Sequence, residues 1–188
     1  MALYAIGDLH LSLGSDKPMD VFGGAWVGYV DKLREGLSVI GPEDTTVLPG
    51  DLSWALGIEQ AKEDFAFISA IPGRKILLKG NHDYWWTSMK KLGELCADEG
   101  FTTLRFLYNN AFEVETFIVA GSRGWYIDES NRRMPENADY QKIVAREAIR
   151  LEISLNEAVK LREKRLSETG EKREILVFLH FPPDFRGY

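Results

Sequence analysis

Short apolar runs recur along the chain, and each of them ends in polar residues. The runs read ALYAIGDLH, TTVLPGDLS, KILLKGNHD, FIVAGSRGW and EILVFLHFPP. A short apolar run that stops at a turn signal is typical of a buried strand, so we predict a strand at each. In open α/β sheets ligands bind at the carboxyl ends of the strands, and the polar residues that follow these runs are therefore the first candidates for a site.

Helical periodicity separates the first three runs. Apolar residues recur at helical spacing at Trp26, Val30, Leu33, Leu37 and Ile40, then at Ala61, Phe65 and Ile68, and then at Met89, Leu92 and Cys96 before Gly100. Alternating strands and helices imply a parallel core with right-handed connections. The following stretch, TTLRFLYNNAFEVETFIVAG, predicts two or three strands in quick succession with a turn at Asn109–Asn110, which indicates a mixed sheet.

The pattern from Ala138 to Thr169 predicts one long amphipathic helix that Gly170 ends. Its outer face is heavily charged. We favour a helix packed on the sheet with a solvated face over a partner-binding or membrane-surface role. No Pro/Gly-rich linker divides the sequence, so we predict a single domain over residues 1–188.

Composition narrows the class of protein. The 188 residues include 23 basic and 29 acidic side chains, a net charge of −6, which makes nucleic acid an unlikely partner. The single cysteine, Cys96, excludes a disulfide framework and fits a reducing compartment, where we expect it to fill core space on a helix. No apolar run is long enough to span a bilayer, so we expect no membrane association and a cytoplasmic location.

Metal-ligating residue types gather at the predicted strand ends. In chain order they are Asp8, His10, Asp51, Asn81, His82, Asp83 and His180. Each of them taken singly fits a turn, a cap or a strand end better than a ligand. Taken together, they include all three histidines of the chain, and oxygen and imidazole ligands at one sheet edge suit a hard-to-borderline divalent cation.

These blocks resemble a known family. GDLH at 7–10, GD at 50–51, GNHD at 80–83 and LH at 179–180 resemble the ordered motifs of the calcineurin-like metallophosphoesterases over nearly the whole chain. More narrowly, GNHDYWW with GSRGW resembles a bacterial group of predicted phosphohydrolases. The resemblance implies an α/β fold in which a sandwich of mixed β-sheets is flanked by helices, with four layers in the order α/β/β/α.

The resemblance also implies a dinuclear site for two divalent metal ions, Mn, Fe, Zn or Mg, and a metal-bound hydroxide as nucleophile. Asp8 and His10 would hold the first metal, Asp51 would bridge both, and Asn81 and His180 would hold the second. His82 would act as a general acid near the leaving oxygen, oriented by Asp83. Gly80 would let the backbone turn sharply enough to aim the Asn81 and His82 side chains.

The sequence departs from the family pattern after His180, where it lacks the Gly-His-x-His block that would complete both metal shells. We expect the chain to be a fragment of a longer protein rather than a natural product that has lost part of its site. Missing final strands would leave a sheet edge open, so we expect an oligomer or another contact to cover it.

Several residues near these blocks bear on the substrate. Arg123 fits a phosphate ligand and a partner of a nearby acid equally well. Four tryptophans follow strand ends; we favour packing beneath loops over stacking on a nucleobase for Trp54, Trp85, Trp86 and Trp125. The segment 11–26 would form either a rim or lid for the site or only a connection.

Three functions remain open from the sequence. We favour a metal-dependent hydrolase of a phosphorylated small molecule or another phosphoester. One alternative is a nuclease or cyclic-nucleotide phosphodiesterase on the same site. The other is a non-catalytic binding module, or an inactive truncated member, which the absent terminal histidines favour and the presence of Asp51, Asn81 and His82 disfavours.

Overall fold

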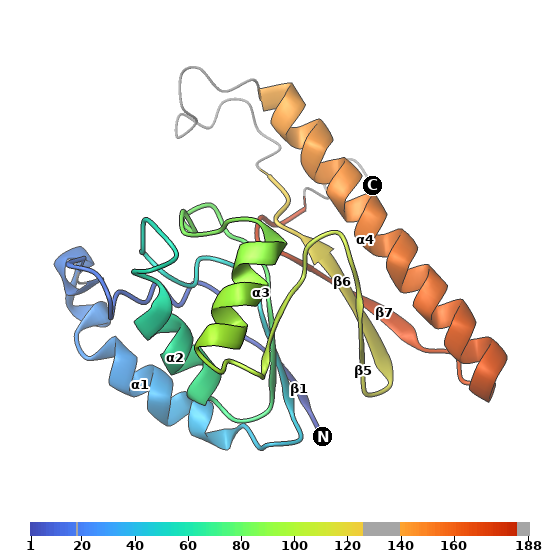
Figure 1. Ribbon diagram of the computed structural model, residues 1–188, viewed down its shortest axis with the longest axis horizontal. Coiled ribbons are helices and arrows are strands. Elements are labelled where there is room, and N and C mark those ends of the chain that lie inside the picture. The colour runs from blue at the N-terminus through green and yellow to red at the C-terminus, as the bar shows by residue number, and fades with distance from the viewer. Residues whose placement is uncertain (18, 126–139, 184–188) are drawn as a thin grey trace. The chain divides into compact units, whose positions relative to one another are not determined.

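The fold is taken from a computed structural model that describes residues 1–17, 19–125 and 140–183. Contacts between residues divide the chain into two compact units, Met1–Phe106 and Leu107–Tyr188 (Figure 1). We describe each unit by itself.

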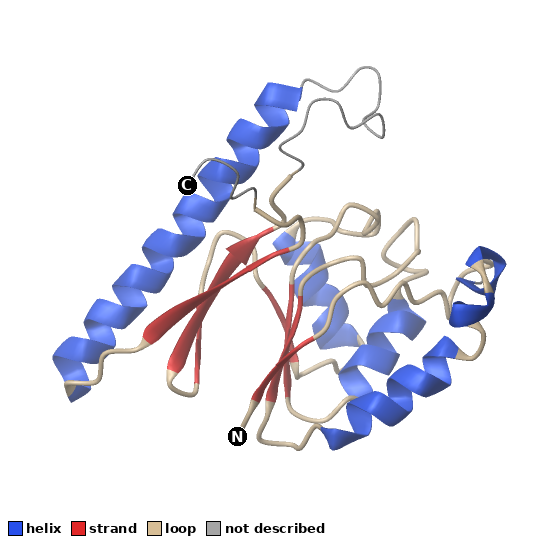
Figure 2. Ribbon diagram, turned by 180° about the vertical axis from the view of Figure 1, so that it is seen from behind, coloured by secondary structure: helices blue, strands red, loops and turns tan. Residues whose placement is uncertain are grey.

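The first unit is a four-stranded parallel sheet with helices packed on it. Its strands are β1 (Leu3–Ala5), β2 (Thr45–Leu48), β3 (Arg74–Leu77) and β4 (Leu104–Phe106). They pair in the order β1-β2-β3-β4, and every pair is parallel. The helices between them are α1 (Tyr29–Gly36), α2 (Lys62–Ala70) and α3 (Met89–Asp98), and Figure 2 shows them on one side of the sheet. The predicted parallel core is confirmed.

The apolar residues that predicted the strands and helices build the core of this unit. Fully buried side chains of the helices pack with buried side chains of the strands. They include Phe65 and Ile68 of α2, Leu92 of α3, Leu48 of β2 and Leu77 of β3. Cys96 lies on α3 and is partly buried against the same cluster, which agrees with its predicted role. Apolar burial of this kind contributes about 25 cal/mol for each Å² removed from water and is the main term that holds the helices on the sheet.

The first predicted helix is shorter than its periodicity suggested. Gly28 adopts a left-handed conformation with φ of 64° immediately before α1, so the regular helix begins at Tyr29. The flanking residues form short 3-10 turns: η1 (Met19–Phe22), η2 (Gly24–Trp26) and η3 (Leu37–Val39). The end of α3 follows the sequence prediction, since Gly100 has a φ of 71° two residues after the helix.

Lys75 is a fully buried lysine at the centre of β3. Its Nζ donates hydrogen bonds to the carbonyl oxygens of Ser69 at 3.1 Å and Gly73 at 2.8 Å, and to that of Ile71. It thereby satisfies carbonyls that the end of α2 leaves without intrahelical donors. Burial lowers the pKa of Lys75 to about 8.

Stability is expected to rise between about pH 8 and pH 10 because of Lys75. An unfolded lysine has a pKa of about 10.4, so within this range the unfolded chain binds more protons than the folded chain. The free energy of unfolding in urea, measured at several pH values, should therefore increase with pH in the wild type. Lys75→Met should lack this contribution, and identical pH profiles for the two proteins would contradict the assignment.

The second unit is a mixed three-stranded sheet with one long helix. Its strands are β5 (Phe112–Val114), β6 (Phe117–Ser122) and β7 (Glu174–Leu179), in the order β5-β6-β7. β5 and β6 are antiparallel, whereas β6 and β7 are parallel over six positions. The sequence predicts two or three strands in the stretch before Ser122, and three are present: β4, β5 and β6. The Asn109–Asn110 turn lies between β4 and β5, and the hairpin between β5 and β6 turns at Glu115, where φ is 52°.

The long helix α4 (Tyr140–Thr169) packs on the sheet of its own unit, as predicted, and ends before Gly170, where φ is 75°. Ala158 is buried against Ile118 and Ala120 of β6. The Ser154 hydroxyl accepts a hydrogen bond from the Gly121 N–H at 2.9 Å and donates to the Asn110 carbonyl at 2.7 Å. These contacts fix the helix on the centre of the sheet.

The α/β class with a parallel sheet, a mixed sheet and flanking helices is thus confirmed. The four-layer stacking, the single-domain organisation and the covered sheet edge remain predictions. Within the described ranges, the helices include none that is long and apolar enough to cross a membrane.

Candidate metal centre

The segments that follow β1 and β2 run side by side beyond the strands. The N–H groups of Asp8, His10 and Leu11 donate to the carbonyls of Gly50, Asp51 and Leu52 at 3.0, 2.9 and 2.9 Å. The Trp54 N–H returns a bond to the Leu11 carbonyl at 2.8 Å. Main-chain hydrogen bonds therefore extend the β1–β2 pairing through the two loops and hold Asp8 and His10 beside Asp51.

Three of the predicted metal ligands have an unusual backbone conformation. Asp8, His10 and Asp51 have φ values of 55°, 45° and 52°, in the left-handed region that residues with a side chain seldom adopt. Such conformations cost of order 1–3 kcal/mol each and persist where the surrounding structure imposes them, which is common at functional sites. Here the hydrogen bonds between the two loops impose them.

The side chains of these three residues converge. Nε2 of His10 lies 3.7 Å from Oδ1 of Asp8 and 3.9 Å from Oδ2 of Asp51, and a carboxylate oxygen of Asp8 lies within 4.8 Å of one of Asp51. These separations exceed a hydrogen bond. Two ligand atoms that each lie about 2.1 Å from a shared cation are roughly 3 to 4 Å apart, and Nε2 of His10 lies at that spacing from one carboxylate oxygen of Asp8 and from one of Asp51.

Asp83 organises the backbone around Asp51. Its carboxylate is fully buried and accepts five hydrogen bonds. The donors are the N–H groups of Asp51 at 2.9 Å, Leu52 at 2.8 Å, Ser53 at 3.3 Å and Gly80 at 2.7 Å, and the indole N–H of Trp85 at 3.0 Å. Burial raises the pKa of Asp83 to about 6, and the N–H groups of Gly80 and Leu52 act in the opposite direction.

The expectation that Asp83 orients the imidazole of His82 is therefore replaced. Its hydrogen bonds go to the main chain and to Trp85, and among the described residues none goes to the His82 ring. The carboxylate is the centre of a turn that joins the loop after β2 to the loop after β3. Asp83 therefore holds the loop after β2 against the loop after β3.

The loop after β3 lies against Asp51. The His82 N–H donates to Oδ1 of Asp51 at 2.8 Å, and the Gly80 N–H is held by Asp83, so Asn81 stands between two anchored residues. Gly80 is required for space rather than for a special φ: a Cβ at this position would collide with Oδ1 and the backbone nitrogen of Asp51. The backbone does bend at Asn81 and His82, directly after Gly80, and the glycine is needed there because two loops approach closely.

The imidazole of His82 is placed by aromatic contacts. Its ring centroid lies 4.5 Å from that of Trp54 and 5.8 Å from that of His10. Nδ1 of His82 is buried, and within the described part of the chain it has no hydrogen-bond partner. Trp54 also stacks on His10, with centroids 5.1 Å apart and planes 21° apart. One indole therefore sets the positions of both imidazoles.

Asp64 supports the same region from α2. This buried carboxylate accepts a hydrogen bond from the Leu13 N–H at 2.8 Å and another from the Ser53 hydroxyl. It ties the segment after His10 to the segment after Asp51. Burial raises the pKa of Asp64, and the Ser53 hydroxyl opposes that shift.

His180 and Arg123 belong to the second unit. His180 directly follows β7, and its ring lies 4.9 Å from that of Phe181. Arg123 follows β6, and its guanidinium donates to Oε1 of the buried Glu147 on α4 at 2.8 Å and lies 4.4 Å from the Trp125 centroid. This geometry favours the pairing of Arg123 with an acid over a phosphate-binding role.

The tryptophans divide between the two interpretations. Trp85 is 1 % exposed and packs edge-on against Phe65, and Trp86 packs against Phe106, as expected for packing beneath loops. Trp54 differs, because it is only partly buried and lines a pocket.

Comparison with known proteins gives the family. The calcineurin-like phosphoesterase family matches residues 1–188. The chain therefore belongs to the calcineurin-like phosphoesterases, a family of phosphoester hydrolases, as the motifs predicted. A comparison with curated proteins finds no match.

Two solved structures are similar to the chain. One is the protein of unknown function AQ665 from Aquifex aeolicus, with 27 % identity, a TM-score of 0.42 and coverage of 77 % of this chain and 71 % of that chain. The other is a phosphopantetheinyl hydrolase from Mycobacterium tuberculosis, with 13 % identity, a TM-score of 0.42 and coverage of 96 % of this chain and 68 % of that chain.

Sequence reasoning missed two features of the site. Asp64 lies in the first turn of α2, and an acidic residue at a position that also fits the core periodicity was the available signal. The left-handed conformations of Asp8, His10 and Asp51 had only a weak signal in the sequence: Asp and His adopt this region more often than most side chains, but glycine is the residue that usually indicates it.

Proposed function

We propose that this protein is a metal-dependent phosphoester hydrolase with a dinuclear centre. Asp8 and His10 would hold one divalent ion, Asp51 would bridge the two, and Asn81 and His180 would hold the second. The family membership supports the reaction class. The carboxylate and imidazole donors around Asp51 suit Mn, Fe, Zn or Mg rather than a softer metal.

The single observation that carries the proposal is the convergence of Asp8, His10 and Asp51 at metal-ligand spacing on three left-handed backbone positions. Aspartate and histidine adopt the left-handed region more often than most other side chains, and aspartate tolerates it in ordinary turns. The spacing of the donor atoms, rather than the backbone conformation, therefore supports a metal site.

The chain's own groups would perform the rest of the reaction. When bound, the two cations would polarise the phosphoryl group and lower the pKa of a water molecule. The imidazole of His82, held by its main-chain bond to Asp51 and by Trp54, would donate a proton to the leaving-group oxygen as that oxygen departs. Because Nδ1 of His82 is buried, Nε2 is the nitrogen that we assign to proton donation. Trp54 shields one face of both imidazoles from water.

Metal content and hydrolysis test the proposal together. We expect protein incubated with manganese and then dialysed to retain about two ions per chain in elemental mass spectrometry. It should hydrolyse p-nitrophenyl phosphate or bis(p-nitrophenyl) phosphate, and chelation should abolish the activity. Comparing the monoester with the diester also tests the phosphodiesterase alternative. Absence of both bound metal and hydrolysis would contradict the proposal and favour a binding module.

A further inference from the structure

The segments 11–17 and 19–27, which follow His10, expose apolar side chains beside the candidate metal centre. Val21 and Phe22 of η1 are 71 % and 67 % exposed. Together with Asp16, Lys17 and Trp54 they line a pocket of 290 Å³. Apolar side chains that gather around a hollow, rather than scatter singly, mark a binding surface.

Two aromatic rings of this pocket are nearly parallel. The centroids of Phe22 and Trp54 lie 6.5 Å apart, with 15° between the ring planes. Stacked aromatic atoms contact one another at about 3.5 Å, so a flat ring between two parallel rings needs about 7 Å. The centroid distance is about 0.5 Å short of that spacing, so the exposed Phe22 side chain must shift outward by at least that much to admit a ring. The plane of Trp54 is fixed, because its indole N–H donates to Sδ of Met19 at 2.7 Å and its ring stacks on His10.

A cation lies at the same pocket. Nζ of Lys17 is 4.8 Å from the centroid of Trp54. Within the described ranges it forms no ion pair with a carboxylate. A ligand ring that enters between Phe22 and Trp54 would therefore meet an ammonium group, which favours electron-rich or anionic ligands.

We propose that this pocket binds a planar aromatic or heteroaromatic leaving group of the phosphoester substrate. Nucleotides and aryl phosphates are the chemical class that it fits. The inference rests on the proposed function, because the link between the pocket and the reaction is Trp54, which contacts the pocket, His10 and His82. Phe22 and Trp54 would clamp the ring while the ester group extends toward Asp8 and Asp51.

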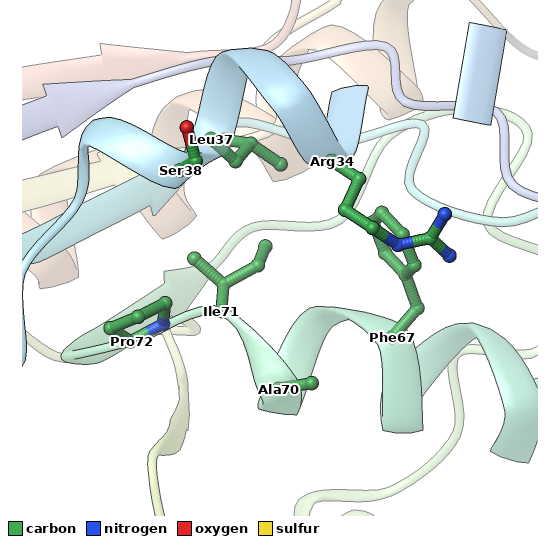
Figure 3. A pocket seen from close by; sticks show the side chains of 7 residues that line it. All are labelled: Arg34, Leu37, Ser38, Phe67, Ala70, Ile71 and Pro72. Carbon is green, nitrogen blue, oxygen red and sulfur yellow. The ribbon is translucent and has the colours of Figure 1, made fainter. Parts of the chain in front are cut away.

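A second pocket of the same unit lacks these properties. Figure 3 shows it between η3 and α2, with a volume of 320 Å³ and mostly apolar walls around Leu37, Phe67 and Ile71. Its one cation, Arg34, already pairs with Asp31 at 2.6 Å and lies over the Phe67 ring. No described residue of the candidate metal centre lines it.

Two phosphonates test the inference. In each, a methylene group replaces the ester oxygen, so binding is measured without turnover. One is the analogue of adenosine 5′-monophosphate, and the other is the analogue of ribose 5-phosphate, which differs only in lacking the base. In calorimetric titrations of the manganese-loaded protein we expect the base to strengthen binding about ten-fold, the scale of one base stacked on an aromatic side chain. Phe22→Ala should remove most of that difference.

The matched control is Leu56→Ala, which truncates another exposed apolar side chain, outside the pocket, and should leave the ratio of the two affinities unchanged. Equal binding of the two phosphonates by the wild type, or an unchanged ratio in Phe22→Ala, would overturn the inference. Hydrolysis of p-nitrophenyl phosphate by the same preparation would show that the proposed function survives that result. Preference for the base in a protein that hydrolyses no phosphoester would overturn the proposed function, and with it the assignment of the ring to a leaving group.

Discussion

Asp51→Asn is expected to lower metal-dependent phosphoester hydrolysis by about a thousand-fold, since metal ions in such sites supply several kcal/mol of transition-state stabilisation. Asp51 is the proposed bridging ligand, and a neutral amide cannot balance two cations. The substitution preserves the side-chain volume and keeps an oxygen to accept the hydrogen bond from the His82 N–H. It also removes a negative charge near the buried carboxylate of Asp83. The loss should therefore come from the metal site and not from unfolding.

Turnover of p-nitrophenyl phosphate and metal content by elemental mass spectrometry would be measured on the same preparation. Asp31→Asn is the matched control, because Asp31 is an exposed residue of α1 that pairs only with Arg34 among the described residues. It should retain wild-type activity and metal. Undiminished hydrolysis by folded Asp51→Asn would remove Asp51 from the centre of the mechanism.

Asp83→Ala should lower the free energy of unfolding by about 4 kcal/mol or more, since each buried donor left without a partner costs about 1–3 kcal/mol. Four main-chain N–H groups and the indole N–H of Trp85 would lose their acceptor together. Whole domains have about 5–15 kcal/mol of stability, so a large share of the total depends on this side chain. The measurement is urea unfolding of the metal-free protein, which separates the effect from metal binding.

Asp83→Asn is a milder change at the same position. The asparagine side chain has one acceptor oxygen in place of two, and its NH₂ group would face at least one of the same N–H donors. We therefore expect the free energy of unfolding to fall by less than in Asp83→Ala. Asp31→Ala is the control for removal of an exposed carboxylate and should change stability by about 0.5 kcal/mol or less. Equal stabilities of Asp83→Ala and Asp31→Ala would show that the loops after β2 and β3 are held together by other contacts.

The strands and most helices could be predicted because each depends on local apolar spacing, and the parallel pairing could be predicted because strands and helices alternate along the chain. Phe65 and Ile68 fall on the buried side of α2, as their separation in the sequence requires. The start of α1 could not be predicted in the same way, because the left-handed conformation of Gly28 ends the helical pattern that begins at Trp26. The pairing of β4 could not be predicted either, because it depends on tertiary contacts: β4 pairs with β3 and not with β5.

The candidate ligands Asp8, His10 and Asp51 could be predicted because they follow strands that pair side by side. The role of Asp83 could not, since its neighbour in sequence, His82, suggested a side-chain partner, whereas its hydrogen bonds go to main-chain groups 30 to 32 residues away and to nearby Gly80 and Trp85. The partner of Arg123 could not be predicted for the same reason, because the acid with which it pairs, Glu147, lies 24 residues further along the chain.

The loops after β1 and β2 are joined by main-chain bonds, from Asp8 to Gly50, from His10 to Asp51 and from Leu11 to Leu52. Such bonds do not depend on which side chains the loops carry. Asp8 and His10 could therefore be exchanged for other ligand types while the scaffold that presents them stays intact. The first unit is on this ground a candidate platform for engineering metal preference, in which the ligand set is rewritten at positions 8 and 10 and Asp83 is left untouched.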